Sequence, residues 1–208
     1  MAIKSATAEE TAALGLAQRE GWPAELRVLA ERYPREVWAG HANLGAMAQF
    51  WLARHDMFRQ LAASLEAGTA RFRAGESATA DYPQWFAPRL QFFLEQLHAH
   101  HQIEDFHYFP IFRAADERLA RGFDVLEADH VALHHDIERS VAAANAMLRA
   151  LANNTGVSDA DALRRAGDDY AAASGPLLKG LARHLEDEED IIVPLILARG
   201  EDALGVGH

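Results

Sequence analysis

The stretch Leu97–Pro110, LHAHHQIEDFHYFP, places four histidines, a Glu–Asp pair and a closing proline within fourteen residues. Residues four apart share one face of a helix, so His100 and Glu104 point the same way. Phe93 and Leu97 precede them on that face, which indicates that both side chains face an apolar interior. Buried charge requires a partner or a metal ion, so further metal-binding side chains are expected elsewhere in the chain.

Around this stretch the sequence predicts an all-α fold, because helical spacing dominates and no long period-2 pattern occurs. Gly175-Pro176 predicts a kink in the last long helix, and Ser158 is a good N-cap for it. The connections are short, which favours an antiparallel, up-down-up-down four-helix bundle. The expected long helices cover about 35–73, the residues from Pro83 and Pro88 to about 115, 119–151, and the residues after 158 to 199, with short N-terminal helical pieces near 7–20 and 23–32.

The composition excludes several classes of function. Half of the 208 residues are hydrophobic, which suits one domain with an extension. The net charge of −11, without a Lys/Arg cluster, argues against nucleic-acid binding, and the absence of cysteine excludes disulfides and thiolate ligands. No signal-peptide pattern opens the chain, and the longest apolar run, 191–198, is too short for a bilayer. A cytoplasmic protein without membrane contact is expected.

Each predicted long helix carries side chains that can bind a metal, and apolar residues surround them. No Lys or Arg occupies a matching position on these faces, so a cation is the simplest partner. Five imidazoles and two carboxylates are too many for one ion, whereas two ions that share two bridging glutamates use all seven. Imidazole and carboxylate suit iron, zinc or manganese. In chain order the seven residues are His55, His100, Glu104, His130, His134, His184 and Glu188.

These residues resemble the hemerythrin-like family, the HHE cation-binding domain. The similar motifs are RHDMF, HHQIED, DHVALHH and HLEDEED, and the resemblance covers about 37–200. It leaves residues 1–36 as a helical N-terminal extension and 201–208 as a C-terminal tail. The resemblance implies a non-haem di-iron centre, with two Fe ions joined by an oxo or hydroxo bridge and by the two carboxylates, and with the histidines as capping ligands. Zn or Mn would also suit these ligands.

Two ligand assignments stay open at this stage. Glu189 is an alternative to Glu188, and His101 with Asp105 is an alternative to His100 with Glu104. A ferritin-like di-iron site is a rival interpretation, because Glu104–His107 and Glu127–His130 fit its ExxH motif. The remaining histidines are expected to be bystanders, and they are His41, His98, His101, His107, His135 and His208.

Three functions are compatible with such a centre. The first is binding, storage or sensing of O2 or of a related small molecule such as NO. The second is an enzyme that acts on peroxide, NO or ferrous iron, with Tyr108 and Asp129 as the nearest proton donors in sequence. The third is a metal-responsive regulatory or interaction module in which residues 1–36 report the metal state. The sequence does not decide among them, nor whether the chain forms a homo-oligomer.

Overall fold

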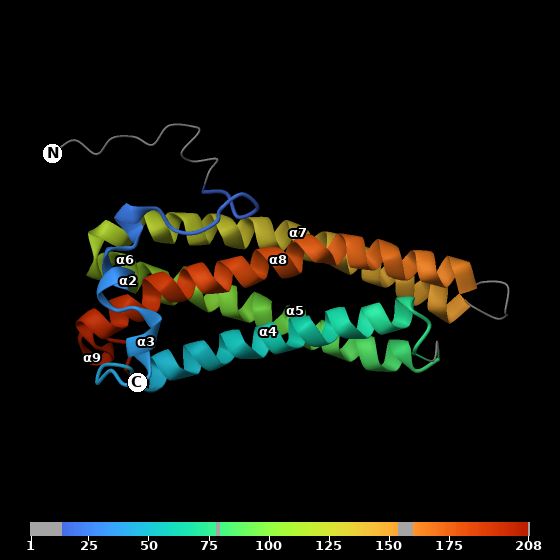
Figure 1. Cartoon of the computed structure of the whole chain (residues 1–208), viewed down its shortest axis with the longest axis horizontal. Helices are drawn as coiled ribbons and strands as arrows, with labels where there is room; N and C mark the ends of the chain where they lie inside the picture. The colour runs from blue at the N-terminus through green and yellow to red at the C-terminus, as the bar shows by residue number, and fades with distance from the viewer. Residues whose placement is uncertain (1–13, 78–79, 154–159, 208) are drawn as a thin grey trace. The chain divides into compact units, whose positions relative to one another are not determined.

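The computed structural model describes residues 14–77, 80–153 and 160–207, and within them it contains helices and turns but no strand. The predicted all-α fold is confirmed. Ser158, the expected N-cap, lies outside the described residues, and no described helix is long and apolar enough to cross a membrane. The long helices in Figure 1 are α4 (Ala46–Arg73), α5 (Tyr82–Ile103), α7 (Ala120–Asn153) and α8 (Ala160–Arg199).

Short elements precede and connect these helices. The helical pieces expected near 7–20 are not seen over 14–20, which form turns, and residues 7–13 lie outside the described part. The second predicted helix is divided in three, because a π-helix separates α5 from α6. The short elements are η1 (Ala24–Leu26), α2 (Val28–Arg32), α3 (Arg35–Trp38), the π-helix η2 (Glu104–Tyr108), α6 (Phe109–Ala115), η3 (Glu117–Leu119) and α9 (Glu201–Leu204).

The first long helix starts later than predicted, at Ala46 instead of about residue 35. The Glu201 carboxylate accepts hydrogen bonds from the backbone N–H groups of Met47 and Ala48, at 3.2 and 2.8 Å. A side chain thus satisfies two N–H groups that a helix start leaves unpaired. A Cβ atom at Gly45 would lie 2.2 Å from this carboxylate, so the contact requires glycine there.

The predicted kink at Gly175-Pro176 does not interrupt the last helix, since α8 runs continuously from Ala160 to Arg199. Pro176 has no N–H to donate to the carbonyl group of Ala172. Ala172, Gly175 and Pro176 are all exposed. Water can therefore satisfy the carbonyl group that the proline leaves without its helical partner.

The chain divides into two compact units, and each long helix contributes one part to each unit. Of the described residues, the first unit comprises 14–54, 103–132 and 182–207. The second unit comprises 55–102 without 78–79, and 133–181 without 154–159. The two units are described separately below.

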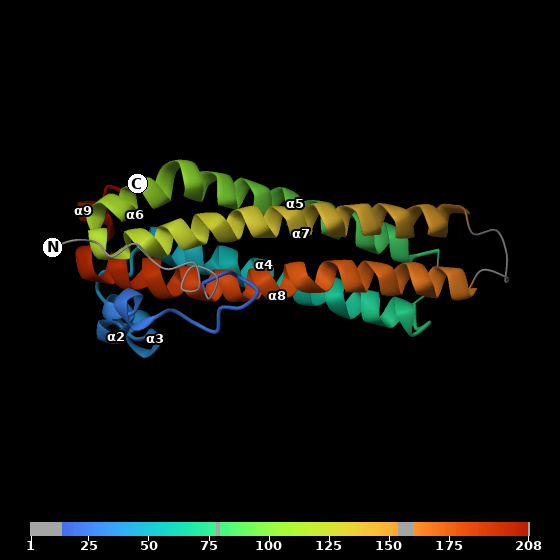
Figure 2. The ribbon, with the colours of Figure 1, turned by 90° about the horizontal axis from the view of Figure 1, so that it is seen from above.

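The core of the first unit is aromatic and aliphatic. Phe109 and Phe112 of α6 pack against Phe123 of α7, with ring centroids 5.4 and 6.3 Å away. Figures 1 and 2 both show α2 and α3 beside the C-terminal part of α8, where Trp38 packs on Val193 and Leu197. These contacts hold the N-terminal segment, residues 14–38, against the domain.

In the second unit, α4 and α5 run antiparallel. The ring centroids of Phe58 and Phe93 are 6.2 Å apart, and the hydroxyl groups of Thr69 and Tyr82 are 3.0 Å apart. Later residues of α4 thus contact earlier residues of α5, as antiparallel helices require. The Tyr82 ring also stacks on Phe72, with ring centroids 4.3 Å apart. The complete up-down-up-down order of the bundle stays a prediction.

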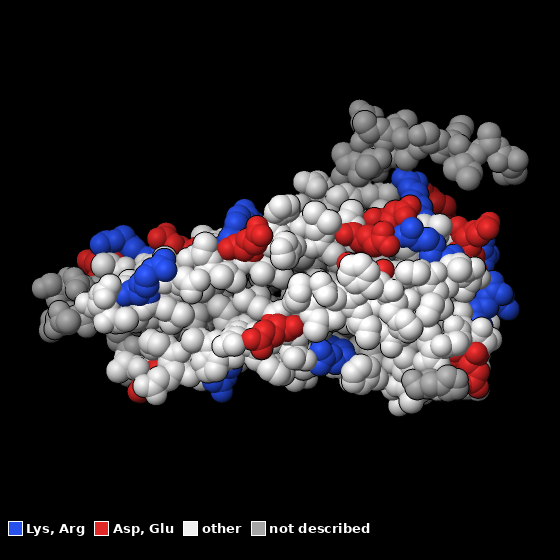
Figure 3. All heavy atoms as spheres, turned by 180° about the vertical axis from the view of Figure 1, so that it is seen from behind, with Lys and Arg blue, Asp and Glu red and all other residues white. Residues whose placement is uncertain are grey.

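The surface carries both signs of charge. On the face in Figure 3, acidic and basic side chains lie close to one another and leave large uncharged areas. Among the ion pairs of the described residues, Arg113 pairs with Asp124 and Glu127 at 3.0 and 2.9 Å. Such mixing gives this face no broad positive field of the kind that attracts nucleic acid.

Candidate metal centre

The first unit brings four buried metal-binding side chains together. Glu104 comes from η2, His130 from α7, and His184 and Glu188 from α8. His130 Nε2 lies 3.1 Å from His184 Nε2 and 3.5 Å from Glu104 Oε2, and His184 Nε2 lies 3.3 Å from Glu188 Oε2. Ligands about 2.1 Å from one ion lie roughly 3–4 Å from one another. These separations are those of atoms that share a cation.

The ring nitrogens of the two histidines also favour a cation. His130 Nδ1 lies 2.7 Å from Asp105 Oδ1, and His184 Nδ1 lies 3.4 Å from Asp129 Oδ2. A carboxylate only accepts hydrogen bonds, so each Nδ1 carries a proton, and each ring in its neutral form presents an Nε2 lone pair. Two lone pairs 3.1 Å apart repel unless a positive charge lies next to them. A proton on one ring or a metal ion supplies that charge.

The two glutamates pose the same requirement. Burial and the charge of Glu188 raise the pKa of Glu104 well above its ordinary value. Burial disfavours a charged His184, but Asp129 and Glu188 outweigh it and raise the pKa of that imidazole to about 9. Two carboxylates can both be ionised in an apolar interior only when cations offset them. The buried His/Glu cluster therefore fits a metal site.

The two glutamates of α8 have different neighbours. The indole Nε1–H of Trp51 donates to Glu188 Oε1 at 2.6 Å, and Glu188 Oε2 faces His184. Glu189 instead accepts from Arg35 Nη1 at 2.7 Å. Glu188 therefore lies in the buried His/Glu cluster, whereas Glu189 lies in an ion pair beside it.

In the second unit, two more predicted ligands lie together and are buried. His55 Nε2 of α4 is 3.2 Å from His100 Nε2 of α5. Phe58 covers His100 with ring centroids 5.1 Å apart. His101, which the sequence assigned to the surface, is buried as well. Both members of the His100–His101 pair thus point inward.

His134 departs from the prediction. Its side chain is 59% exposed, and its Nε2 lies 3.5 Å from Glu138 one turn further along α7. The HxxxH spacing allowed His130 and His134 one face, but the cluster uses only the first of them. His98, His107 and His135, which were predicted to be bystanders, are exposed.

The ferritin-like interpretation does not match the structure. Its two ExxH motifs require His107 and Glu127 as ligands. His107 is exposed, and Glu127 accepts a hydrogen bond from Arg113 at 2.9 Å. Tyr108, considered as a proton donor, packs its ring 4.9 Å from Trp51.

The π-helix η2 positions Glu104 and Asp105, and sequence reasoning missed it. Pro110 cannot donate to the carbonyl group of Phe106, which an α-helix would require. The chain forms a wider turn over Glu104–Tyr108 and places Pro110 in the first turn of α6. Such turns are frequent at functional sites. The proline ten residues after His100 was the available signal, although it indicated only an end or a bend.

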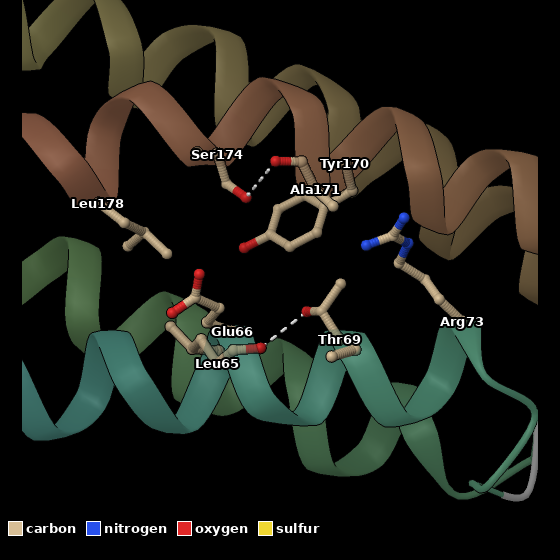
Figure 4. A pocket seen from close by; sticks show the side chains of 10 residues that line it. Leu65, Glu66, Thr69, Arg73, Tyr170, Ala171, Ser174 and Leu178 are labelled. Atoms are coloured by element: carbon tan, nitrogen blue, oxygen red, sulfur yellow. Dashed lines mark hydrogen bonds between the residues drawn. The ribbon is translucent and has the colours of Figure 1, made fainter.

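A cavity of about 250 Å³ in the second unit differs from the candidate metal centre in the residues that line it (Figure 4). The hydroxyl groups of Thr69 and Ser174 donate to the carbonyl oxygens of Leu65 and Ala171. Burial raises the pKa of Tyr170, another lining residue. This cavity has no histidine among its lining residues and offers no comparable set of ligands.

The helical fold and the buried histidines and glutamates together define a cation-binding helical protein. Residues 46–196 match the sequence model of the Hemerythrin HHE cation binding domain. The chain belongs to this family, because the match covers most of its length. No curated protein and no solved structure matches it.

Proposed function

We propose that this chain is a non-haem di-iron protein that binds O2 or a related small molecule such as NO. The observation that carries the proposal is the pair of fully buried carboxylates, Glu104 and Glu188, among imidazoles. Family membership supports a bound cation. Imidazole and carboxylate ligands suit iron, with zinc or manganese as the competing choices.

The proposed ligands are buried side chains in each of the two compact units. The first unit contributes Glu104, His130, His184 and Glu188, and the second unit contributes His55, His100 and His101. His101 replaces the exposed His134 of the sequence prediction. Seven donors are too many for one ion, which supports two ions.

An iron pair would supply reversible electron exchange with a diatomic molecule. The protein contributes a site rich in nitrogen ligands, which stabilises the reduced pair. Phe58 and Phe109 are buried beside His100 and His130, with ring centroids 5.1 and 5.5 Å away, and exclude water. Trp51 holds one oxygen of Glu188, so the other oxygen is left to face the proposed ions.

Metal analysis of protein purified without a metal-binding tag tests the proposal, together with absorption spectra under air and under nitrogen. We expect two iron ions per chain and a visible band that depends reversibly on O2. Protein that holds two irons and shows no such band would contradict O2 binding. Steady consumption of peroxide by the same sample, lost in His130→Ala, would indicate an enzyme instead.

A further inference from the structure

A buried arginine outside the family domain contacts two aspartates beside the candidate centre. Arg19 lies in the N-terminal segment, before residue 46 where the family match begins. Its Nε donates to Asp187 Oδ2 at 2.7 Å, and its Nη1 donates to Asp129 Oδ1 at 3.2 Å. Its Nη2 donates to Asp129 Oδ2. One guanidinium thus joins two buried aspartates from α7 and α8.

The Asp129 oxygen that accepts from Arg19 Nη2 also faces His184. Oδ2 lies 3.4 Å from His184 Nδ1, and the other ring nitrogen, Nε2, faces His130 and Glu188. A carboxylate bound to Nδ1–H sets the orientation of a ligand histidine and strengthens its metal bond. Arg19 fixes the position of that carboxylate.

The two ligand histidines of the first unit differ in this respect. His130 is oriented by Asp105 of η2, which lies inside the family domain and whose side chain is 34% exposed. His184 is oriented by Asp129, which is buried and held by Arg19 from outside the family domain. The N-terminal segment therefore acts on the orientation of His184 and not on that of His130.

Arg19 contacts Asp129 next to a cavity. A cavity of about 360 Å³ lies where Leu14 and Leu16 meet the α7 residues Val125, Ala128 and Asp129. Apolar contact between the segment and α7 is therefore incomplete here. Arg19 also stacks its guanidinium 4.9 Å from the Trp22 ring, whose Nε1–H donates to the Asp187 carbonyl oxygen at 2.7 Å. Arg19 and Trp22 thus supply polar contacts that hold the start of the segment to α7 and α8.

We propose that Arg19 is a positioning residue for the metal centre, through which the N-terminal segment controls retention of the ion bound by His184. The inference rests on the proposed function. Coupling between two sites is reciprocal in free energy, so a bound metal should also stabilise the docked segment.

Release of Zn(II) from loaded protein to an excess of chelator tests this role. Arg35 provides a matched control, because it holds the same segment to α8 through Glu189 and Asp190, neither of which is a proposed ligand. We expect Arg19→Gln to release one of two ions about tenfold faster than the wild type, and Arg35→Gln to leave both rates unchanged. Equal release from Arg19→Gln and wild type would overturn the proposal.

The Nδ1–H proton resonance of His184 in metal-free protein is a second measurement, assigned by its loss in His184→Gln. We expect Arg19→Gln to shift or broaden it and Arg35→Gln to preserve it. Arg19→Lys keeps the charge but cannot join both aspartates, so it should resemble Arg19→Gln. If Arg19→Gln loses the circular dichroism signal of its helices, both measurements are made on Arg19→Lys instead. An unchanged resonance in Arg19→Lys would overturn the link.

The two proposals fail in different ways. A wild type that retains fewer than two Zn(II) ions contradicts the di-metal function. The metal-free resonance still decides whether Arg19 acts on His184 in that case. A wild type that retains two ions, with Arg19→Gln identical to it, refutes only the role of Arg19.

Discussion

Replacing Glu104 by glutamine should change the stability of the metal-free and the metal-loaded protein in opposite directions. Glu104 is fully buried, and burial together with Glu188 raises its pKa. The metal-free fold therefore bears the cost of desolvating a charge or of taking up a proton. A glutamine amide fills the same volume, can donate to Glu188 and carries no charge.

The expected gain for the metal-free variant is about 1–4 kcal/mol in the free energy of unfolding, the range seen when buried ionic groups are replaced. For a chain of this size, each kcal/mol raises Tm by about 2–4 °C. With metal the order reverses at an ion concentration about 1,000-fold above Kd, because the wild type then gains about 4.1 kcal/mol. The variant lacks a proposed ligand and should gain much less.

Thermal unfolding followed by circular dichroism, with and without Zn(II), measures both effects. Glu138→Gln is the control, since Glu138 is 63% exposed and pairs only with histidines of its own helix among the described contacts. It should change neither Tm nor the shift on metal binding. A metal-free Glu104→Gln protein that is less stable than the wild type, or one with the full metal-induced shift, would refute the reasoning.

Three further changes test the site and its support. His101→Ala should lower bound metal to about one ion per chain by elemental analysis, whereas the exposed His134→Ala should retain two; the reverse result would restore the sequence assignment. Trp51→Phe removes the indole hydrogen bond to Glu188, so Zn(II) affinity measured by chelator competition should fall about 10–100-fold, and unchanged affinity would show that this bond does not position the ligand. Glu201→Gln weakens the cap of α4, so Tm should fall by about 2–4 °C, from a loss of about 1 kcal/mol, with metal content unchanged; a Tm equal to that of the wild type would contradict the capping role.

The local sequence pattern was enough to determine the helical class and most of the candidate ligands. Periodicity predicted α7 and α8 to within a few residues, because long helices repeat their apolar face many times. The spacing of His100 with Glu104, and of His184 with Glu188, placed each pair on one face. The chemistry of buried imidazole and carboxylate then indicated a cation.

Only the tertiary structure distinguished His101 from His134. Four-residue spacing states that two side chains share a face, but the direction of that face depends on how the helix is rotated in its unit. Three residues after His101 the chain enters the π-helix Glu104–Tyr108, which a regular helical pattern in the sequence does not predict. The same spacing left His134 exposed beside Glu138.

The contacts of Arg19 depend on tertiary structure for a different reason. Asp129 and Asp187 lie 110 and 168 residues from it in sequence, so no local rule connects them. From its sequence neighbours alone, Arg19 would be interpreted as a solvated charge. Folding places it in a buried position between two aspartates, one of which holds His184. The sequence thus supplies the candidate ligands, while packing between distant segments decides which side chains hold them in place.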